Sequence, residues 1–133
     1  MSDTTVVDAH PLLWYFEGNP KLSADGRRRL ANPLAKLLVP TIALAEVCWT
    51  IGKAKSLISV DDVRYGVTTD FRFAIVPLDT DLVFAAAVLP AQLEMHDRMI
   101  VATAARAHGR DPSVKLLTAD VDIQRSGLVP TVW

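Results

Sequence analysis

The sequence predicts an α/β fold, an α/β/α sandwich with a central parallel sheet, and three observations lead to it. Short runs of β-branched and aliphatic residues alternate with longer segments of helical periodicity. Capping and turn residues separate the two kinds of segment. Half of the 133 residues are hydrophobic and 22% are charged, a balance that allows a buried core. This alternation is typical of parallel strands with helices on both faces of the sheet.

Four segments have the length and apolar composition of buried strands, and an extended segment ends the chain. The strands are expected at residues 5–8, 37–39, 73–76 and 114–117, and the last extended segment at 129–133. Helical spacing fills the intervals between them. The helices are expected at residues 12–17, 23–30, 42–54, 59–70, 80–89 and 97–108, with a short helical turn after residue 120.

Several of these helices carry recognisable end signals. Ser23 and Thr41 are expected to be N-caps, because a hydroxyl can accept a hydrogen bond from a free backbone N–H of the first turn. Ser59 and Asp62 have the spacing of a capping box. Gly109 is expected just beyond the end of its helix, where glycine tolerates the left-handed conformation. No linker or repeat interrupts the pattern, so we expect a single domain over residues 1–133.

Composition excludes several classes of protein. The longest apolar run begins at Leu82 and is ten residues long, shorter than the roughly 18 residues of a membrane span. No basic stretch leads into a long apolar core at the N-terminus, and the lone Cys48 has no partner for an internal disulfide. We therefore expect a cytoplasmic protein with no membrane segment. The net charge of −1 means that any nucleic-acid binding depends on local basic patches, of which residues 27–29 are the densest.

Four acidic residues fall where the predicted sheet would bring them together. Asp8 ends the first strand, and Asp120 follows the fourth. Glu46 lies one turn into the helix after the second strand, and Asp97 lies at a helix start. Open parallel sheets bind ligands outside the carboxyl ends of their strands, so we expect these four side chains to share one cleft.

Each acid also has a structural interpretation. Asp8 and Asp120 could cap the helices that follow them. Asp97 is favoured at a helix start by about 0.3–1 kcal/mol through the macrodipole alone. Glu46 shares a helix face with other polar residues, as on a solvated surface. The evidence for a site is therefore the set of four and not any single member.

Such a cluster requires a cation or protons. Two carboxylates about 4 Å apart repel by about 4 kcal/mol at an effective dielectric constant of about 20. Oxygen ligands without cysteine or clustered histidine favour Mg²⁺ or Mn²⁺ over Zn²⁺. The cleft is therefore predicted to bind Mg²⁺, with Mn²⁺ able to substitute.

Four segments in order resemble the motifs of PIN-domain ribonucleases, and in particular the VapC-like toxins of VapBC toxin–antitoxin pairs. The first is a hydrophobic strand ending in Asp, the second ends in Glu, the third is Asp-Arg before a small-residue helix, and the fourth ends in Asp. These segments are Val6–Trp14, Pro40–Val47, His96–Ala104 and Leu116–Asp120, and the resemblance covers nearly the whole chain.

The resemblance implies a PIN-like sandwich and assigns the site. Its acidic cluster, catalytic and metal-binding, would be Asp8, Glu46, Asp97 and Asp120. Thr118 would support the cluster by a hydroxyl hydrogen bond. The chain departs from the family at Ala9, where many relatives have Ser or Thr. Asp122 follows closely on Asp120 and is a further candidate ligand.

The same resemblance implies what the protein does. It would be a Mg²⁺-dependent endoribonuclease that leaves a 5′-phosphate and a 3′-hydroxyl, and it would act as the toxin of a VapBC-type pair. Arg98 would contact the RNA backbone. The partners would be a second copy of the chain and a cognate antitoxin, a small DNA-binding protein that occludes the acidic cleft.

Alternative functions remain open from the residues alone. His10 and His96 could serve as acid and base in a metal-free ribonuclease. A haloacid-dehalogenase-like phosphatase would need a second Asp where His10 stands. A receiver domain would need neighbouring acids after its first strand, an Asp at the end of a mid-chain strand and a late Lys, and the region of Asp79 fits this poorly. A degenerate, non-catalytic PIN-like module that binds a protein or RNA is the main alternative.

Overall fold

The computed structural model describes residues 3–54, 56–90 and 92–133. Its centre is a five-stranded sheet in which every pair of neighbouring strands is parallel, in the order β3-β2-β1-β4-β5. The strands are β1 (Thr4–Val7), β2 (Lys36–Pro40), β3 (Phe73–Val76), β4 (Lys115–Leu117) and β5 (Thr131–Val132). The predicted parallel sheet is confirmed, and the final extended segment forms its fifth strand.

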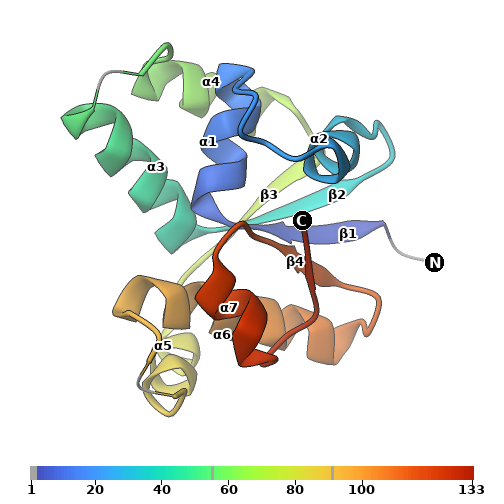
Figure 1. Ribbon diagram of the computed structural model, residues 1–133, viewed down its shortest axis with the longest axis vertical. Helices are drawn as coiled ribbons and strands as arrows, with labels where there is room; N and C mark the ends of the chain where they lie inside the picture. The colour runs from blue at the N-terminus through green and yellow to red at the C-terminus, as the bar shows by residue number, and fades with distance from the viewer. Residues whose placement is uncertain (1–2, 55, 91) are drawn as a thin grey trace.

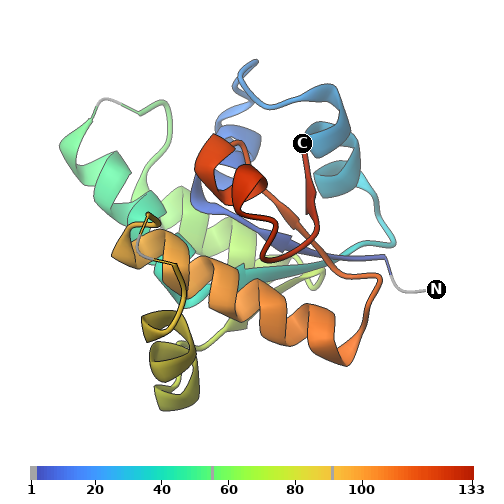
Figure 2. The same cartoon turned by 60° about the horizontal axis from the view of Figure 1, so that its bottom comes forward.

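Helices cover both faces of this sheet, which confirms the predicted α/β/α sandwich. The helices are α1 (Ala9–Glu17), α2 (Ala24–Ala31), α3 (Thr41–Lys53), α4 (Val60–Thr69), α5 (Thr80–Ala87), α6 (Met95–Arg110) and α7 (Val121–Ser126). Figure 1 shows α1 to α4 above the sheet and α5 to α7 below it. Turning the molecule shows α6 running along the lower face beneath the strands (Figure 2). No helix in the described ranges is both long and apolar enough to cross a membrane.

Helix ends agree with the sequence at some positions and differ at others. The capping box of Ser59 and Asp62 is present at the start of α4. Thr41 was expected as a cap, but the N-cap of α3 is Pro40, and the Thr41 hydroxyl instead donates to the Val76 carbonyl at 2.8 Å. This bond joins α3 to the end of β3. Gly109 was expected beyond its helix, but α6 continues through it to Arg110.

The core lies between the sheet and its two helical layers. Strand residues such as Val6, Val39 and Leu116 are fully buried, as are Leu12 of α1 and Ile100 of α6. Alternate residues of parallel strands face opposite helical layers, so both faces of the strands are apolar. Because the same core supports both layers, the helices and strands that carry polar side chains at the sheet edge are held in place by packing.

The strand order places a crevice beside β1. The chain moves from β1 outward to β2 and β3 through helices on one face, and then crosses to β4 and β5 through helices on the other. At β1 and β4 the chain therefore leaves the sheet toward opposite faces, which opens a crevice at their carboxyl ends. The register pairs Val7 with Leu117, so Asp8 and Thr118 emerge side by side into it.

Candidate active site

A hydrogen-bonded network of four residues lies at this crevice. The Thr118 hydroxyl donates to Asp8 Oδ2 at 2.6 Å, although the two residues are far apart in the sequence. The same hydroxyl oxygen accepts from the Asp120 backbone N–H at 3.0 Å. The Gln124 side-chain amide donates to the Thr118 carbonyl at 2.9 Å. These bonds fix the end of β4 against the end of β1.

Asp8 and Asp120 also cap the helices that follow them. Asp8 Oδ1 accepts from the Ala9 N–H at 2.7 Å, and Asp120 Oδ1 accepts from the Ile123 N–H at 3.0 Å. The structural interpretation of both residues therefore holds, but capping occupies one oxygen of each carboxylate. Capping and a role in the cleft are compatible for Asp8 and Asp120.

Asp8 is the most deeply buried acid of the group, with a residue exposure of 5%. Burial raises the pKa of Asp8 above the usual aspartate range, and the charge of Asp120 raises it further. The hydrogen bonds from Thr118 and Ala9 and the nearby His10 oppose this rise. Asp8 is thus a desolvated carboxylate supported by hydrogen bonds and without a salt-bridge partner among the described residues.

Glu46 and Asp97 face the same crevice from α3 and α6. Burial, followed by the charges of other acids beginning with Asp8, raises the pKa of Glu46 to about 7. Burial, followed by the charges of Asp120 and Asp8, raises the pKa of Asp97 to about 6. Mutual repulsion of this kind requires that the carboxylates lie close together. The structure therefore brings together all four acids that the sequence singled out.

Glu94 is a fifth acid that the sequence analysis missed. It lies at the N-cap position of α6, three residues before Asp97, and its charge raises the pKa of both Glu46 and Asp97. The spacing of one helical turn from Asp97 was the available signal. Asp122 lies apart from this group, because it is exposed on α7 and is not among the charges that shift the other acids.

One observation bears directly on whether the cleft suits a cation. Glu46 Oε1 is a buried oxygen with no hydrogen-bond partner. A buried acceptor of this kind is costly to leave unpaired, and a bound cation would satisfy it. The donor set is carboxylate oxygen throughout, which suits Mg²⁺. Within the described part of the chain, no three His, Cys, Asp or Glu side chains stand close enough to hold one ion.

The histidines and Arg98 are less suited to the roles considered for them. His10 is exposed and packs against the Trp14 ring at 5.4 Å between centroids, and His96 is exposed at the start of α6. Arg98 donates from Nε to the Leu93 carbonyl at 3.0 Å and from Nη1 to the Ala87 carbonyl at 3.4 Å. Arg98 therefore holds the connection between α5 and α6, and only its remaining N–H groups are available to RNA.

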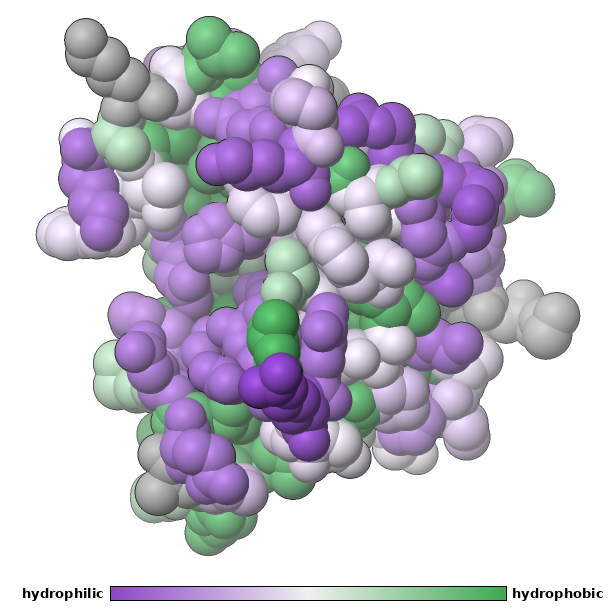
Figure 3. All heavy atoms as spheres, viewed as in Figure 1, coloured by the Kyte–Doolittle hydropathy of each residue, from purple (hydrophilic) through white to green (hydrophobic). Residues whose placement is uncertain are grey.

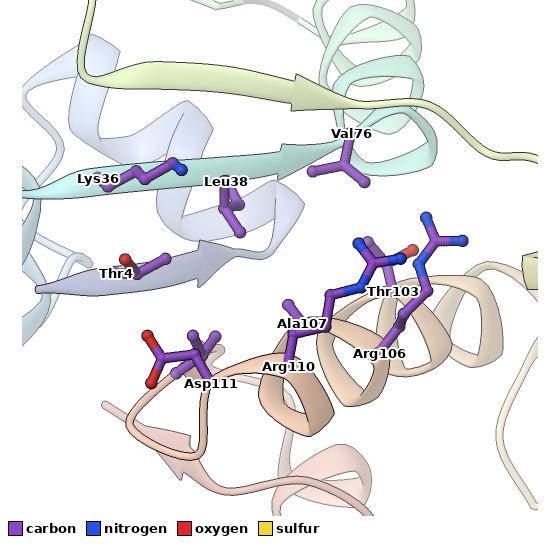
Figure 4. A pocket seen from close by; sticks show the side chains of 10 residues that line it. Thr4, Lys36, Leu38, Val76, Thr103, Arg106, Ala107, Arg110 and Asp111 are labelled. Carbon is purple, nitrogen blue, oxygen red and sulfur yellow. The ribbon is translucent and has the colours of Figure 1, made fainter. Parts of the chain in front are cut away.

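A separate cavity of about 390 Å³ lies between the sheet and the carboxyl-terminal half of α6 (Figure 4). Lys36, Arg106 and Arg110 contribute positive charge to it, and Thr4 and Lys36 place it at the amino ends of β1 and β2. Arg106 is paired with Asp79 at 2.7 Å. This cavity contains none of the clustered acids, so its chemistry is distinct from that of the crevice.

Comparison with known proteins places this geometry in context. The model of the PIN domain family matches residues 5–127. Among solved structures, VapBC2 from Rickettsia felis, bound to a DNA fragment from its promoter, is similar with a TM-score of 0.68 and 14% identity, covering 97% of each chain. FitAcB from Neisseria gonorrhoeae is similar with a TM-score of 0.66 and 15% identity, covering 97% of this chain and 96% of the other. No curated protein matches significantly.

Proposed function

This chain belongs to the PIN-domain family, and from that premise we propose that it is a metal-dependent endoribonuclease, the toxin of a VapBC-type toxin–antitoxin pair. Its 133 residues would act as one nuclease domain. The observation that carries the proposal is the convergence of Asp8, Glu46 and Asp97, whose pKa values are all raised in one crevice. Perturbed acids gathered at the carboxyl ends of parallel strands are typical of catalytic sites.

In this proposal the acids of the crevice bind Mg²⁺ or Mn²⁺ together. Asp8, Glu46, Asp97 and Asp120 would supply the ligand oxygens, and Asp122 is left out because of its position on α7. When bound, such a cation lowers the pKa of a water and stabilises charge on a phosphodiester. Thr118 keeps one Asp8 oxygen fixed by its hydrogen bond, and so restricts the direction in which Asp8 presents its lone pairs.

The proposed products are an RNA fragment with a 5′-phosphate and one with a 3′-hydroxyl, as the family resemblance implies. Arg98 lies next to Asp97 on α6, and the remaining N–H groups of its side chain would contact the RNA backbone beside the acids. Phosphate contacts of this kind position a strand without reading its sequence.

The proposed partners follow from the solved relatives. VapBC2 from Rickettsia felis, which this chain resembles in fold, is bound to a DNA fragment from its promoter. We propose that this chain likewise has a cognate antitoxin of separate sequence, that it forms a homodimer, and that the complex is cytoplasmic. The antitoxin would cover the acidic crevice and neutralise its charge.

Metal dependence provides the direct test. Purified protein should cleave RNA in Mg²⁺ or Mn²⁺, lose cleavage in EDTA, and regain it when Mg²⁺ is restored in excess. Full activity in EDTA would contradict the metal role and would favour a metal-free mechanism with His10 and His96 as acid and base. If wild-type protein cuts no RNA under any condition and does not arrest growth when expressed alone, the non-catalytic alternative becomes the better description.

A further inference from the structure

A groove beside the acidic crevice has the chemistry of a nucleobase site. Its cavity of about 470 Å³ is lined by Ile42, Ala45, Glu46 and Trp49 of α3 and by His96 of α6. This volume lies within the roughly 300–1,000 Å³ of small-ligand sites. We call it the Trp49 groove. In the space-filling view the surface is indented between α3 and the start of α6, with hydrophilic side chains at its border (Figure 3).

The four lining residues of α3 form one face of that helix. Positions 42, 45, 46 and 49 follow the spacing of a single helical stripe, while Ala43 and Val47 point into the core. Ala45 is small and leaves room above the helix. Trp49, at the outer end of the stripe, is 70% exposed. The opposite face of α3 packs into the core, so the Trp49 indole stays open to water. Its apolar surface is therefore available to a ligand.

The groove is continuous with the proposed catalytic group. Glu46 lines the groove and also belongs to the acidic cluster, and His96 is the residue before Asp97. A strand whose phosphate lies at the acids would therefore place an adjacent nucleotide over the groove. We propose that the Trp49 groove binds an unpaired nucleobase next to the cleaved phosphate, with the base stacked on the Trp49 indole and His96 at the opposite wall. This inference rests on the proposed ribonuclease function.

The chemistry of the walls favours a base over an apolar side chain. A purely apolar occupant would remove water from Glu46 without offering it a hydrogen bond, which is costly. Base edges carry N–H donors as well as a π-face, so a base can satisfy the carboxylate and cover the indole together. Because only an unstacked base can enter, the proposal predicts preference for single-stranded RNA or loops over duplex.

The test measures binding of a labelled 12-nucleotide unstructured RNA by fluorescence anisotropy, with Ca²⁺ in place of Mg²⁺ so that the strand stays intact. Removing a stacked base contact costs about 1–3 kcal/mol, and 1.4 kcal/mol corresponds to tenfold. Trp49→Ala should therefore raise Kd about tenfold. Trp49→Phe should retain most of the affinity, whereas Trp49→Leu, which keeps apolar bulk without a π-face, should not.

Two controls separate stacking from a general effect on the surface. Tyr65 of α4 is 71% exposed, matches Trp49 in exposure and lies outside the groove, so Tyr65→Ala should leave Kd unchanged. An abasic ribose-phosphate strand of equal length should bind wild type and Trp49→Ala equally. Because Trp49 is largely exposed, all three Trp49 variants should melt close to wild type.

Two results would overturn the nucleobase site. One is unchanged binding of the base-bearing strand by Trp49→Ala and Trp49→Leu. The other is an equal loss on the base-bearing and abasic strands. If either is found while wild-type protein still cuts RNA in Mg²⁺, the nuclease function stands and only the base site fails. If wild-type protein neither binds nor cuts RNA, both proposals fail together.

Discussion

Two groups of acids in this molecule have opposite electrostatic surroundings. Asp25, Asp70 and Asp79 lie outside the crevice, and each is paired with an arginine that holds its pKa below the usual aspartate range. The acids in the crevice face other acids instead, and burial and repulsion raise the pKa values of Asp8, Glu46 and Asp97. The sign of the shift therefore separates the two groups.

The difference indicates which acids serve folding and which serve a ligand. A paired carboxylate stabilises the folded state, whereas a buried group of like charges opposes it. A chain retains such a destabilising group where function requires it. The comparison thus provides a physical reason to look for chemistry at the crevice and for stability at the arginine pairs.

The largest expected effect is on cleavage. Asp8→Asn, Asp97→Asn and Glu46→Gln should each reduce the cleavage rate by orders of magnitude, because each removes a charged ligand oxygen from the proposed metal site. Asp25→Asn should leave the rate close to wild type, although it loses its contacts with Arg28 and Arg29. Cleavage of one RNA under single-turnover conditions in Mg²⁺ measures all four variants.

The paired group should behave in the opposite way, with an effect on stability and little on activity. Arg72, whose side chain is 11% exposed, donates to Asp70 at 2.8 Å and to the Leu30 and Asn32 carbonyls at 2.7 Å each. Arg72→Met removes the guanidinium from all three acceptors. Asp70 then keeps only the backbone N–H of residue 72 and the Asn32 carbonyl only the Ala35 N–H, so the free energy of unfolding should fall by about 2–4 kcal/mol. Urea denaturation gives this value.

Arg28→Met is the matched control for that stability measurement. Arg28 also pairs with an acid, Asp25, but its side chain is 75% exposed. Exposed pairs contribute about 0–1 kcal/mol, so this variant should unfold close to wild type. If Arg72→Met impaired cleavage well below its unfolding temperature while Arg28→Met did not, the separation between stabilising and catalytic acids would break down at Asp70.

Much of the fold was predictable because its signals are local. Alternating apolar runs and helical spacing predict the strands and helices, and the capping box of Ser59 and Asp62 needs only four consecutive residues. Thr41 was assigned wrongly because its hydroxyl has a partner on β3, 35 residues away, that no local pattern reveals. Gly109 was assigned wrongly because α6 continues to Arg110 despite the low helix propensity of glycine.

The site was predictable to the extent that topology alone brings residues together. The carboxyl ends of β1 and β4 meet in any parallel sheet of this order, which places Asp8 beside Thr118 and near Asp120. Glu94 and the Trp49 groove were not foreseen. Glu94 could have been found from its spacing of one helical turn from Asp97. The groove depends on how α3 and α6 pack against each other, and packing between distant helices leaves no periodic signal in the sequence.

The raised pKa of Glu46 predicts how stability depends on pH without metal. Its pKa is 4.5 ordinarily and about 7 in the folded protein, so the folded state binds the proton more tightly. In EDTA the stability that protonated Glu46 contributes to the folded state is fully present below pH 4.5 and is lost as pH rises toward 7. Glu46→Gln cannot ionise, so its free energy of unfolding should fall by about 1–2 kcal/mol less than that of wild type as pH rises through this range. The difference is smaller than the full pKa shift of Glu46 would give, because the side chain is partly exposed to solvent.

Denaturation of both proteins in EDTA at pH 5 and pH 8 measures this difference. The subtraction cancels groups common to the two proteins. The paired acids do not interfere, because their lowered pKa values confine their loss of stability to pH values below the ordinary aspartate range. Identical pH profiles for wild type and Glu46→Gln would mean that burial and the neighbouring acids do not raise the pKa of Glu46, which the comparison requires.

The smallest expected effect concerns Asp120, a crevice acid that caps α7 and whose charge also raises the pKa of Asp97. Asn caps helices about as well as Asp, so Asp120→Asn should keep the bond to Ile123 and lose the repulsion. In EDTA it should melt at the wild-type temperature or up to about 3 °C higher, which corresponds to about 0.5 kcal/mol.

Added Mg²⁺ should then stabilise Asp120→Asn less than wild type, because ligand stabilisation scales with affinity. The exposed Asp122 supplies the control: Asp122→Asn should match wild type both in EDTA and in its Mg²⁺ shift. Thermal melts of the three proteins with and without Mg²⁺ decide between the two acids. A lower melting temperature for Asp120→Asn in EDTA with an undiminished Mg²⁺ shift would make Asp120 a structural cap. If Mg²⁺ fails to stabilise Asp122→Asn but still stabilises Asp120→Asn, the metal ligand is Asp122 of α7. The charge repulsion between acids would then be a wrong guide to which acid binds the ion.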